Sequence, residues 1–430
     1  MSVDLPLSGA CATSRAESRG GPWRHTPRGL ASVTVGLLSW LIPIAFLAWA
    51  LRLAILEGYV YEVPGNFPGD FSWTTSLGLQ ELLRRGMFYG PIFVLEWRYL
   101  ADPELLSHAD FARLDYGLFL ASFACTWLAL FGTVRPRLAI FVLAAWLAHH
   151  ASVEAFSNTA HPEILEFALI CASLLVAVRG QRRAAGGLLG LAMSTKTLPG
   201  LFLPYLALRR QWSMLLAAAV MAGVVFFVVC WIQGITPVAG LVDLVYQNGN
   251  LTKLSFTEYE YSPRADFARI VAGSASELSA DQAALVVGLH VGLSLIVLAL
   301  VGWIVLKADP SKRHEGLFFG LVAAAMLIVS PSVHLAYYIF LLPAWTAILA
   351  EVLRRPISPG TAGLWGGLVA GYVFTGFDQP FFLMQRVAGF GLIVPQNWLA
   401  WHLPAIALLV TLVTLGLTLL SARRSEPAST

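Results

Sequence analysis

Apolar residues along this chain come in long runs separated by short polar stretches. Runs of about 20 residues are long enough to cross roughly 30 Å of hydrocarbon as helices. The pattern predicts about 12 helical segments, and the number lies between 10 and 13 depending on how the short segments are counted. They are roughly 33–51, 112–131, 138–151, 162–178, 184–195, 197–208, 213–232, 284–306, 316–329, 335–350, 361–376 and 399–420. The two short segments 184–195 and 197–208 are either spans, half-helices or a re-entrant pair.

Composition supports the same class. Of the 430 residues, 57% are hydrophobic and only 12% are charged, whereas a soluble domain carries about 25% charged residues. The chain is therefore expected to be an all-α polytopic membrane protein. The 4 cysteines are scattered, and they suggest neither a disulfide framework nor a metal cluster.

The basic residues predict the orientation, because cytoplasmic loops collect Lys and Arg. The short basic clusters all fall on the same side of the 12-span arrangement as the Arg-rich N-terminal tail: Arg135/Arg137, Arg179/Arg182/Arg183, Arg209/Arg210, Lys307/Lys312/Arg313, Arg354/Arg355 and Arg423/Arg424. Both termini are then expected to be cytoplasmic, and the protein is expected to lie in the plasma membrane. We expect a disordered tail at 1–30, one integral membrane domain at 31–421 and a C-terminal tail at 422–430.

The polar residues that could take part in binding or catalysis gather on the opposite, extracytoplasmic side. The long first and fourth outer loops, about 52–111 and 233–283, are expected to carry short amphipathic helices. A charge at membrane depth costs about 2.5–3.5 kcal/mol and is kept mainly where it lines a wet cavity or meets a charged ligand. The candidate residues on this side are Asp70, Arg84, Arg85, Tyr89, His161, Glu163, Lys196, Asn248, Lys253 and His334.

Each candidate also has a purely structural interpretation. Asp70 follows Pro68-Gly69 and can form an Asx-type turn, and Glu163 is in a position to favour the start of a helix through the helix dipole. Lys196 can extend to the membrane interface, and His334 can bond to the backbone at a turn. Arg84 and Arg85 can contact lipid headgroups, so residue type alone does not decide these roles.

Motifs of soluble nucleotide-dependent enzymes are missing from the sequence. It contains no Walker A loop, Rossmann glycine fingerprint, HExxH pattern or GxSxG elbow. A cytosolic nucleotide is therefore not expected as donor, and an enzyme of this kind needs a substrate that arrives already activated. Polyprenyl-phosphate sugars, carried in the same membrane, meet that requirement.

Several motifs resemble one enzyme family. The stretch GDFSWTTSLGLQELLRRGMFYGPIF at 69–93 is similar to the first outer loop of polyprenol-phosphate-sugar-dependent glycosyltransferases of the GT-C superfamily. In particular it is similar to the actinobacterial family that includes the phosphatidylinositol-mannoside α-1,2-mannosyltransferases and some arabinofuranosyltransferases. These proteins show an aspartate and, further on, Gly-x-x-Tyr-x-Pro-Pro. Here Asp70 is followed by Gly86, Tyr89 and Pro91, with Gly90 between the tyrosine and the proline.

Two further stretches agree with this family, and one departs from it. STKTLPGLFLPYLALRRQW at 194–212 resembles its Lys-x-x-Pro span, and SPSVHLAYYIFLLPAW at 330–345 resembles its Ser-Pro-x-x-x-His-Tyr segment. The loop around Asn248 is similar to an Asn-Gln-Ser loop. Where the family usually has Gly-Gln-x-Asn, this chain has His161 and Glu163, which leaves the sugar undefined.

The resemblance implies a reaction and roles. An inverting enzyme of this kind transfers one sugar, mannose as first choice and arabinofuranose as second, from a polyprenyl phosphate to a hydroxyl of a glycolipid or polysaccharide acceptor outside the cytoplasm. Asp70 is implied as the general base, and Lys196 and His334 as stabilisers of the leaving phosphate. Arg84, Arg85, His161 and Lys253 are further phosphate candidates, Glu163 a second acid and Tyr89 a sugar-stacking ring. No metal, cofactor or nucleic-acid partner is implied.

Two other functions remain compatible with the sequence. A transporter or flippase of a lipid-linked saccharide also carries intramembrane charges and broken helices, but it should show related halves, and no convincing internal repeat is present. A non-catalytic scaffold for envelope assembly is the other alternative. Movement of labelled lipid without a new glycosidic bond would indicate the flippase.

Overall fold

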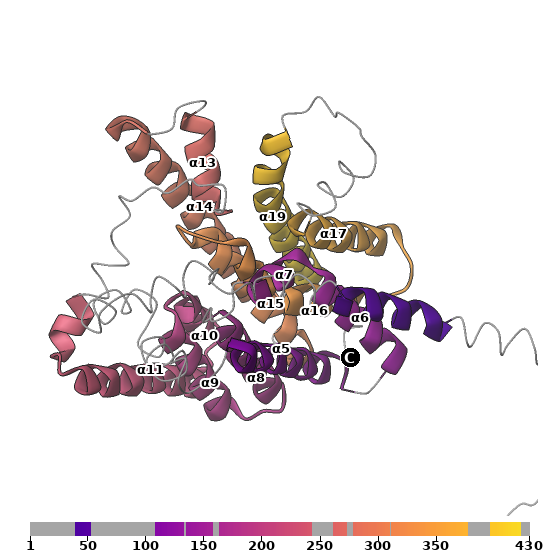
Figure 1. Cartoon of the computed structure of the whole chain (residues 1–430), viewed down its shortest axis with the longest axis horizontal. Helices are drawn as coiled ribbons and strands as arrows, with labels where there is room; N and C mark the ends of the chain where they lie inside the picture. The colour runs from indigo at the N-terminus through magenta and orange to yellow at the C-terminus, as the bar shows by residue number, and fades with distance from the viewer. Residues whose placement is uncertain are drawn as a thin grey trace, which may run out of the picture. The chain divides into compact units, whose positions relative to one another are not determined.

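The computed structural model describes residues 39–52, 108–132, 135–157, 163–242, 261–272, 278–309, 311–376 and 396–422, which form helices joined by turns and extended segments, with no strand among them. The helices are Ser39–Arg52, α5 His108–Phe131, α6 Pro136–Ala148, α7 His150–Ser157, α8 Glu163–Val178, α9 Arg182–Thr195, α10 Phe202–Leu208, α11 Trp212–Gln233, α13 Pro263–Ala272, α14 Ala280–Lys307, α15 Glu315–Val329, α16 Leu342–Val352, α17 Pro359–Thr375 and α19 Gln396–Ala422; the 3-10 helices are η1 Leu198–Leu201, η2 Lys312–His314 and η3 Leu335–Leu341 (Figure 1). The described residues from Pro43 onward belong to one compact unit.

Each of the predicted apolar segments coincides with a helix or a helix pair, which confirms the all-α class. Within the described ranges, 5 helices are long and apolar enough to cross a membrane, or up to 6 if a bent pair counts as one span. That bent pair is α6 and α7, which the sequence pattern presents as one segment at 138–151 but which bends by 64°. The number of spans, predicted as about 12, therefore stays a prediction.

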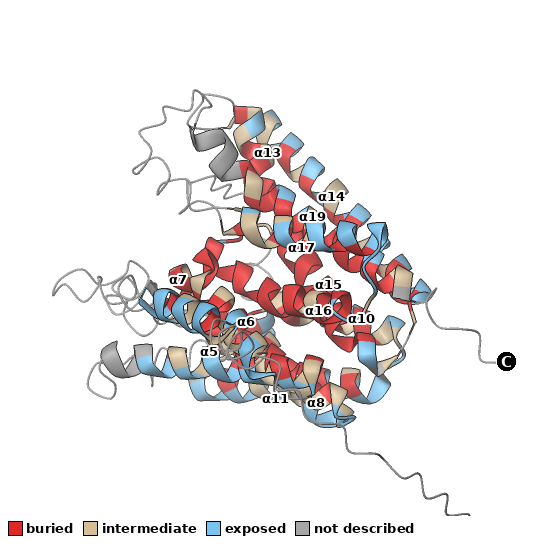
Figure 2. Ribbon diagram, turned by 90° about the vertical axis from the view of Figure 1, so that its right-hand side faces the viewer, coloured by how far each residue is buried: buried red, intermediate tan, exposed pale blue. Residues whose placement is uncertain are grey.

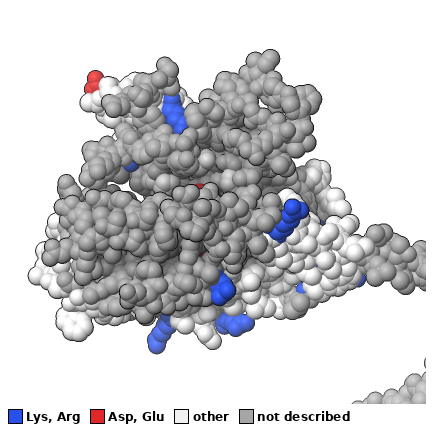
Figure 3. Space-filling view, in the orientation of Figure 1, with Lys and Arg blue, Asp and Glu red and all other residues white. Residues whose placement is uncertain are grey.

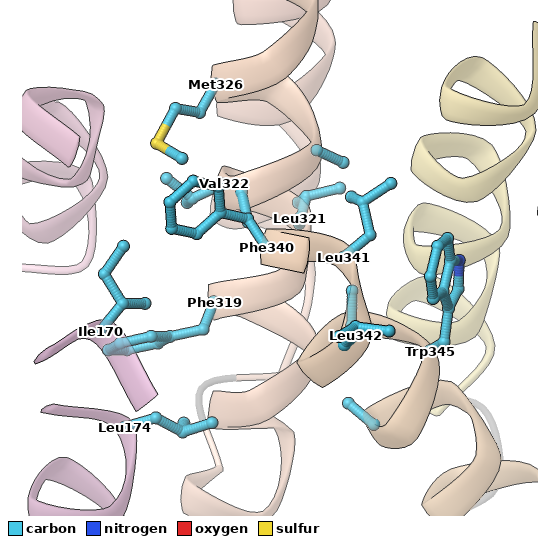
Figure 4. Packing of buried hydrophobic residues seen from close by; sticks show 14 of the residues in the cluster. Ile170, Leu174, Phe319, Leu321, Val322, Met326, Phe340, Leu341, Leu342 and Trp345 are labelled. Carbon is cyan, nitrogen blue, oxygen red and sulfur yellow. The ribbon is translucent and has the colours of Figure 1, made fainter. Parts of the chain in front are cut away.

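α15 is the centre of the helical packing. Every residue from Glu315 to Ile328 is buried, because α15 is surrounded by α8, α14, α16, α19 and η3 (Figure 2). Its ring Phe319 lies beside Ile170 of α8, and Val322 lies beside Phe340 of η3 (Figure 4). A helix that is apolar on all sides needs neighbours on all sides, and this one has them.

Glycines allow the closest helix contact. α9 packs along α11, and a Cβ at Gly190 would lie 2.7 Å from Met221 Cβ and would collide with the Ala218 carbonyl oxygen. A Cβ at Gly186 would collide with the Met214 carbonyl oxygen in the same way. Small residues four positions apart let two backbones approach, as is common between membrane helices.

Arginine–glutamate contacts gather at one end of several helices. Arg182, the first residue of α9, lies 2.8 Å from Glu315, the first residue of α15. Glu351 near the end of α16 accepts from Arg313 at 3.2 Å, and Arg354 donates to the Leu130 carbonyl oxygen near the end of α5. Three of the predicted basic clusters thus contribute a residue to these helix ends: Arg182, Arg313 and Arg354. Lys196 follows the other end of α9, roughly 20 Å away along a helix of 14 residues.

Candidate active site

The candidate site lies where three helices begin or end, next to the end of α9 that Lys196 follows. α8 begins at Glu163 and α9 ends at Thr195, and since α8 and α9 pack as a hairpin, these two ends lie together. α15 ends at Val329 because Ser330 precedes Pro331, and a residue before proline is steered away from helical geometry. The extended turn that follows leads to His334 and then into η3.

Lys196 and Glu163 form a buried ion pair. Lys196 Nζ donates to Glu163 Oε1 at 2.8 Å, and their side chains are only 10% and 1% exposed. The lysine ammonium also lies 4.0 Å from the centre of the Tyr337 ring, an attractive cation–π distance. The ammonium is therefore held between a carboxylate and an aromatic face, so its position is well defined.

Glu166 adds a second acid close to this pair. It lies three residues after Glu163 on α8, a spacing that puts both side chains on neighbouring positions of one helix face. Glu166 is completely buried, and neither of its carboxyl oxygens has a hydrogen-bond partner in the described part of the chain. The helix-start interpretation of Glu163 holds as well, because Glu163 occupies the first turn of α8, as does Glu166.

His334 approaches the same tyrosine from the turn before η3. It is the exposed N-cap residue of η3, and its ring centre lies 6.0 Å from that of Tyr337. Its backbone carbonyl oxygen accepts from the Tyr337 amide at 3.1 Å, and its side chain makes no capping hydrogen bond to η3. The structure thus brings together Glu163, Lys196 and His334 around Tyr337, which the sequence reasoning did not single out although it follows His334 in the quoted SPSVHLAYY stretch.

The remaining predicted site residues lie outside the described residues. These are Asp70, Arg84, Arg85, Tyr89, His161, Asn248 and Lys253, together with the tails 1–30 and 423–430. In the ranges that are described, no group of three or more His, Cys, Asp or Glu residues is arranged to hold a metal ion. The Lys and Arg side chains that belong to described residues on the face in Figure 3 are separate from one another rather than joined in one patch.

An apolar cavity of about 310 Å³ lies between α6, α16 and α17, with Phe46 in its wall. Its walls are rich in aromatic rings: Phe46, Phe141, Trp146, Trp345, Trp365 and Tyr372. Two of these rings, Trp345 and Tyr372, also pack on His149, at the bend between α6 and α7. α7 in turn packs on η3, which carries Tyr337, so the cavity lies one short helix away from the candidate site.

The sequence pattern of glycosyltransferase family 87 matches residues 88–331, more than half of the chain. The chain belongs to glycosyltransferase family 87. This family is of the GT-C type, so the protein is a multi-pass membrane glycosyltransferase. The family 87 match includes Glu163 and Lys196, begins after Asp70 and ends shortly before His334. Neither a curated protein nor a solved structure matches the chain.

Proposed function

We propose that this family 87 glycosyltransferase moves a sugar from a polyprenyl-phosphate donor to a hydroxyl group of a glycolipid or glycan acceptor on the extracytoplasmic face, with inversion at the anomeric carbon. Mannose is the first choice of sugar and arabinofuranose the second. The bond between the anomeric carbon and the phosphate oxygen breaks, the acceptor oxygen forms the new bond, and its proton passes to a base. The family assignment supports glycosyl transfer, and the finer features are our proposal.

The buried ammonium of Lys196 carries the proposal. A leaving phosphate gains negative charge in the transition state, and a fixed cation in a water-poor site stabilises that charge strongly. Glu163 at 2.8 Å and the Tyr337 ring at 4.0 Å hold the ammonium in place. The His334 ring lies 6.0 Å from the same tyrosine ring, centre to centre, and the residue is exposed. It is therefore accessible to the phosphate as a second donor.

Asp70 is proposed as the general base, and the first outer loop as the place where the acceptor meets the donor. This assignment rests on the resemblance of the 69–93 stretch, because a carboxylate placed there can take the acceptor proton. The predicted outer position has a direct test. A Ser72→Cys variant should react with a membrane-impermeant thiol reagent applied to intact cells; reaction only after permeabilisation would overturn the orientation.

The aromatic cavity is proposed to hold part of the donor's isoprenoid tail. A branched hydrocarbon chain needs an apolar surface, and the cavity walls are almost entirely apolar. Its volume of about 310 Å³ is at the lower end of the usual range for ligand pockets, about 300–1,000 Å³. One part of a long tail would therefore lie inside, while the rest would remain among membrane lipids.

The test uses the purified full-length protein with polyprenyl-phosphate mannose or polyprenyl-phosphate arabinofuranose and a lipid acceptor. Formation of a glycosidic bond with one donor supports the proposal. Asp70→Asn should lower the rate by roughly 10²–10⁴-fold, the usual contribution of a general base, and Lys196→Met should also abolish most transfer. The matched control is Asp281→Asn, at an exposed acid in the first turn of α14, which should transfer normally.

The alternatives give different results in the same preparation. Movement of labelled donor across vesicles without a new glycosidic bond would replace the proposal with a flippase. Normal transfer by folded Asp70→Asn protein would remove Asp70 as the base while leaving the glycosyltransferase assignment intact. A folded protein that forms no bond and moves no lipid with either donor would contradict the proposed donor class.

A further inference from the structure

A second buried ionic group lies on α13, in the predicted fourth outer loop. Asp266 Oδ1 accepts from Arg269 at 3.0 Å and lies 3.2 Å from His402 Nδ1. The side chains of Asp266, Arg269 and His402 are 10%, 8% and 7% exposed. His402 belongs to α19, which packs on α13. A single carboxylate therefore joins two helices whose sequence positions are far apart.

The residues just before α13 are bonded to the turn that carries His334. The Tyr261 amide donates to the Val333 carbonyl oxygen at 2.7 Å, and the Ser262 hydroxyl donates to the Pro331 carbonyl oxygen at 3.1 Å. The Tyr338 hydroxyl donates in return to the Tyr261 carbonyl oxygen at 3.1 Å. These bonds fix the peptide groups immediately before His334, so a displacement of α13 would displace His334.

The described groups around Asp266 come from every element that packs on it. Arg264 and Arg269 are on α13 itself, His402 is on α19, and the Tyr338 hydroxyl is on η3. The neighbouring α14 contributes His290, close to Arg264. Burial raises the pKa of Asp266 from 3.8 to about 7, and the nearby Arg269 opposes that rise. The carboxylate therefore gains its charge in the neutral range.

We propose that Asp266 is a positioning residue for the transfer reaction: its carboxylate holds Arg269 and His402, fixes α13 against α19, and thereby fixes the turn that presents His334. The inference rests on the proposed function, in which His334 contacts the donor phosphate. In its charged form Asp266 makes the ion pair with Arg269 and keeps the contact with His402. In its protonated form it loses them, and the turn before His334 is less constrained.

The expected pH dependence of transfer follows from the difference between these two forms of Asp266. Transfer by the native protein should rise as pH increases through about 7, where Asp266 becomes charged. Asp266→Asn cannot gain the charge, so it should keep the low-pH rate across the range from about pH 5.5 to about pH 8.5. At the alkaline end its kcat should be roughly 10- to 100-fold below the native value, the cost expected of a displaced group. Asp266→Glu should recover part of the rise.

A second readout does not depend on activity. Hydrogen–deuterium exchange of the peptide that contains Tyr261 should be faster in Asp266→Asn than in the native protein at neutral pH, because the Tyr261–Val333 bond opens more often. The matched control is Asp281→Asn, the same substitution at an exposed acid of the neighbouring α14. It should change neither the exchange nor the pH profile.

The outcomes separate this inference from the proposed function. Faster exchange at Tyr261 together with a flat pH profile supports it. Unchanged exchange in Asp266→Asn, or a kcat that falls by the same factor at every pH, overturns it. If the native protein transfers no sugar from either polyprenyl-phosphate donor, the proposed function fails, and the exchange experiment alone decides whether Asp266 positions the turn.

Discussion

Lys196 Nζ and Glu163 Oε1 lie 2.8 Å apart and 33 positions apart in sequence, in a place where both side chains are almost fully buried. A buried ion pair contributes little net stability, because each charge loses its hydration. Breaking such a pair is nevertheless costly, because the remaining charge is left buried. The pair therefore fits a functional site better than a simple structural brace.

The first prediction is that a single substitution in this pair lowers the free energy of unfolding more than the double substitution does. Glu163→Ala should lower the free energy of unfolding by about 3–5 kcal/mol, the usual cost of an uncompensated buried charge. The double variant Glu163→Ala with Lys196→Met should lose less stability than Glu163→Ala alone, and clearly less than the sum of the two single variants. Thermal unfolding in one detergent measures all of them, and strictly additive losses would contradict the pairing.

The second prediction concerns the close contact of α9 and α11. Gly190→Ala should destabilise the fold by about 1–3 kcal/mol, because the new methyl group has no space and overpacking is costly. Gly187 is the matched control on the same helix, since a Cβ there would meet only Met221 Cε at 3.8 Å. Gly187→Ala should be neutral or gain roughly 0.5–1 kcal/mol. Equal melting temperatures for the two variants would show that the helices do not approach this closely.

The third prediction is a pH dependence of stability at Asp266. The pKa of this carboxyl is about 7 in the folded chain, against an ordinary value of 3.8. The folded state thus holds a proton that the unfolded state releases, so the contribution of Asp266 to stability falls as pH rises from about 4 to about 7. Asp266→Asn should remove this fall. Unfolding curves of native and variant protein over that range test it, and parallel curves would contradict the raised pKa.

The folded protein is thus less stable when Asp266 is charged than when it is protonated. By our inference, the protein with charged Asp266 is nevertheless the more active one. Stability and transfer rate should change in opposite directions as pH rises through the neutral range. A general loss of structure would instead lower both together. Measuring both quantities on the same preparation therefore distinguishes a positioning role from simple destabilisation.

The fourth prediction concerns the aromatic cavity. Ala145 lies in its wall, and Ala145→Phe should fill part of it. The KM for a donor with a long isoprenoid tail should rise several-fold, whereas a donor with a very short tail should be affected little. Val224→Phe, at an exposed position of α11 outside the cavity, serves as control. Equal effects on long-tail and short-tail donors would place the tail elsewhere.

The helical class and the approximate positions of the helices were predictable from sequence. Long apolar runs have the length of helices that cross a membrane. Prolines at 136, 199, 343 and 359 mark where helices begin. The bend at His149 was not predictable. No proline or glycine interrupts the 138–151 run, and the break depends on contacts of His149 with Thr375, Trp345 and Tyr372 from distant helices.

The candidate site was predictable as separate residues only. Its charges stand out because an apolar chain does not keep a lysine or glutamate at helix ends without a reason, so Glu163, Lys196 and His334 could be named from the sequence alone. Their partners could not. Pairing of Lys196 with Glu163, the placement of Tyr337 between Lys196 and His334, and the contact of Asp266 with His402 each join segments far apart in sequence. Hydropathy defines which segments become helices, whereas the packing of those helices against each other decides which charges meet.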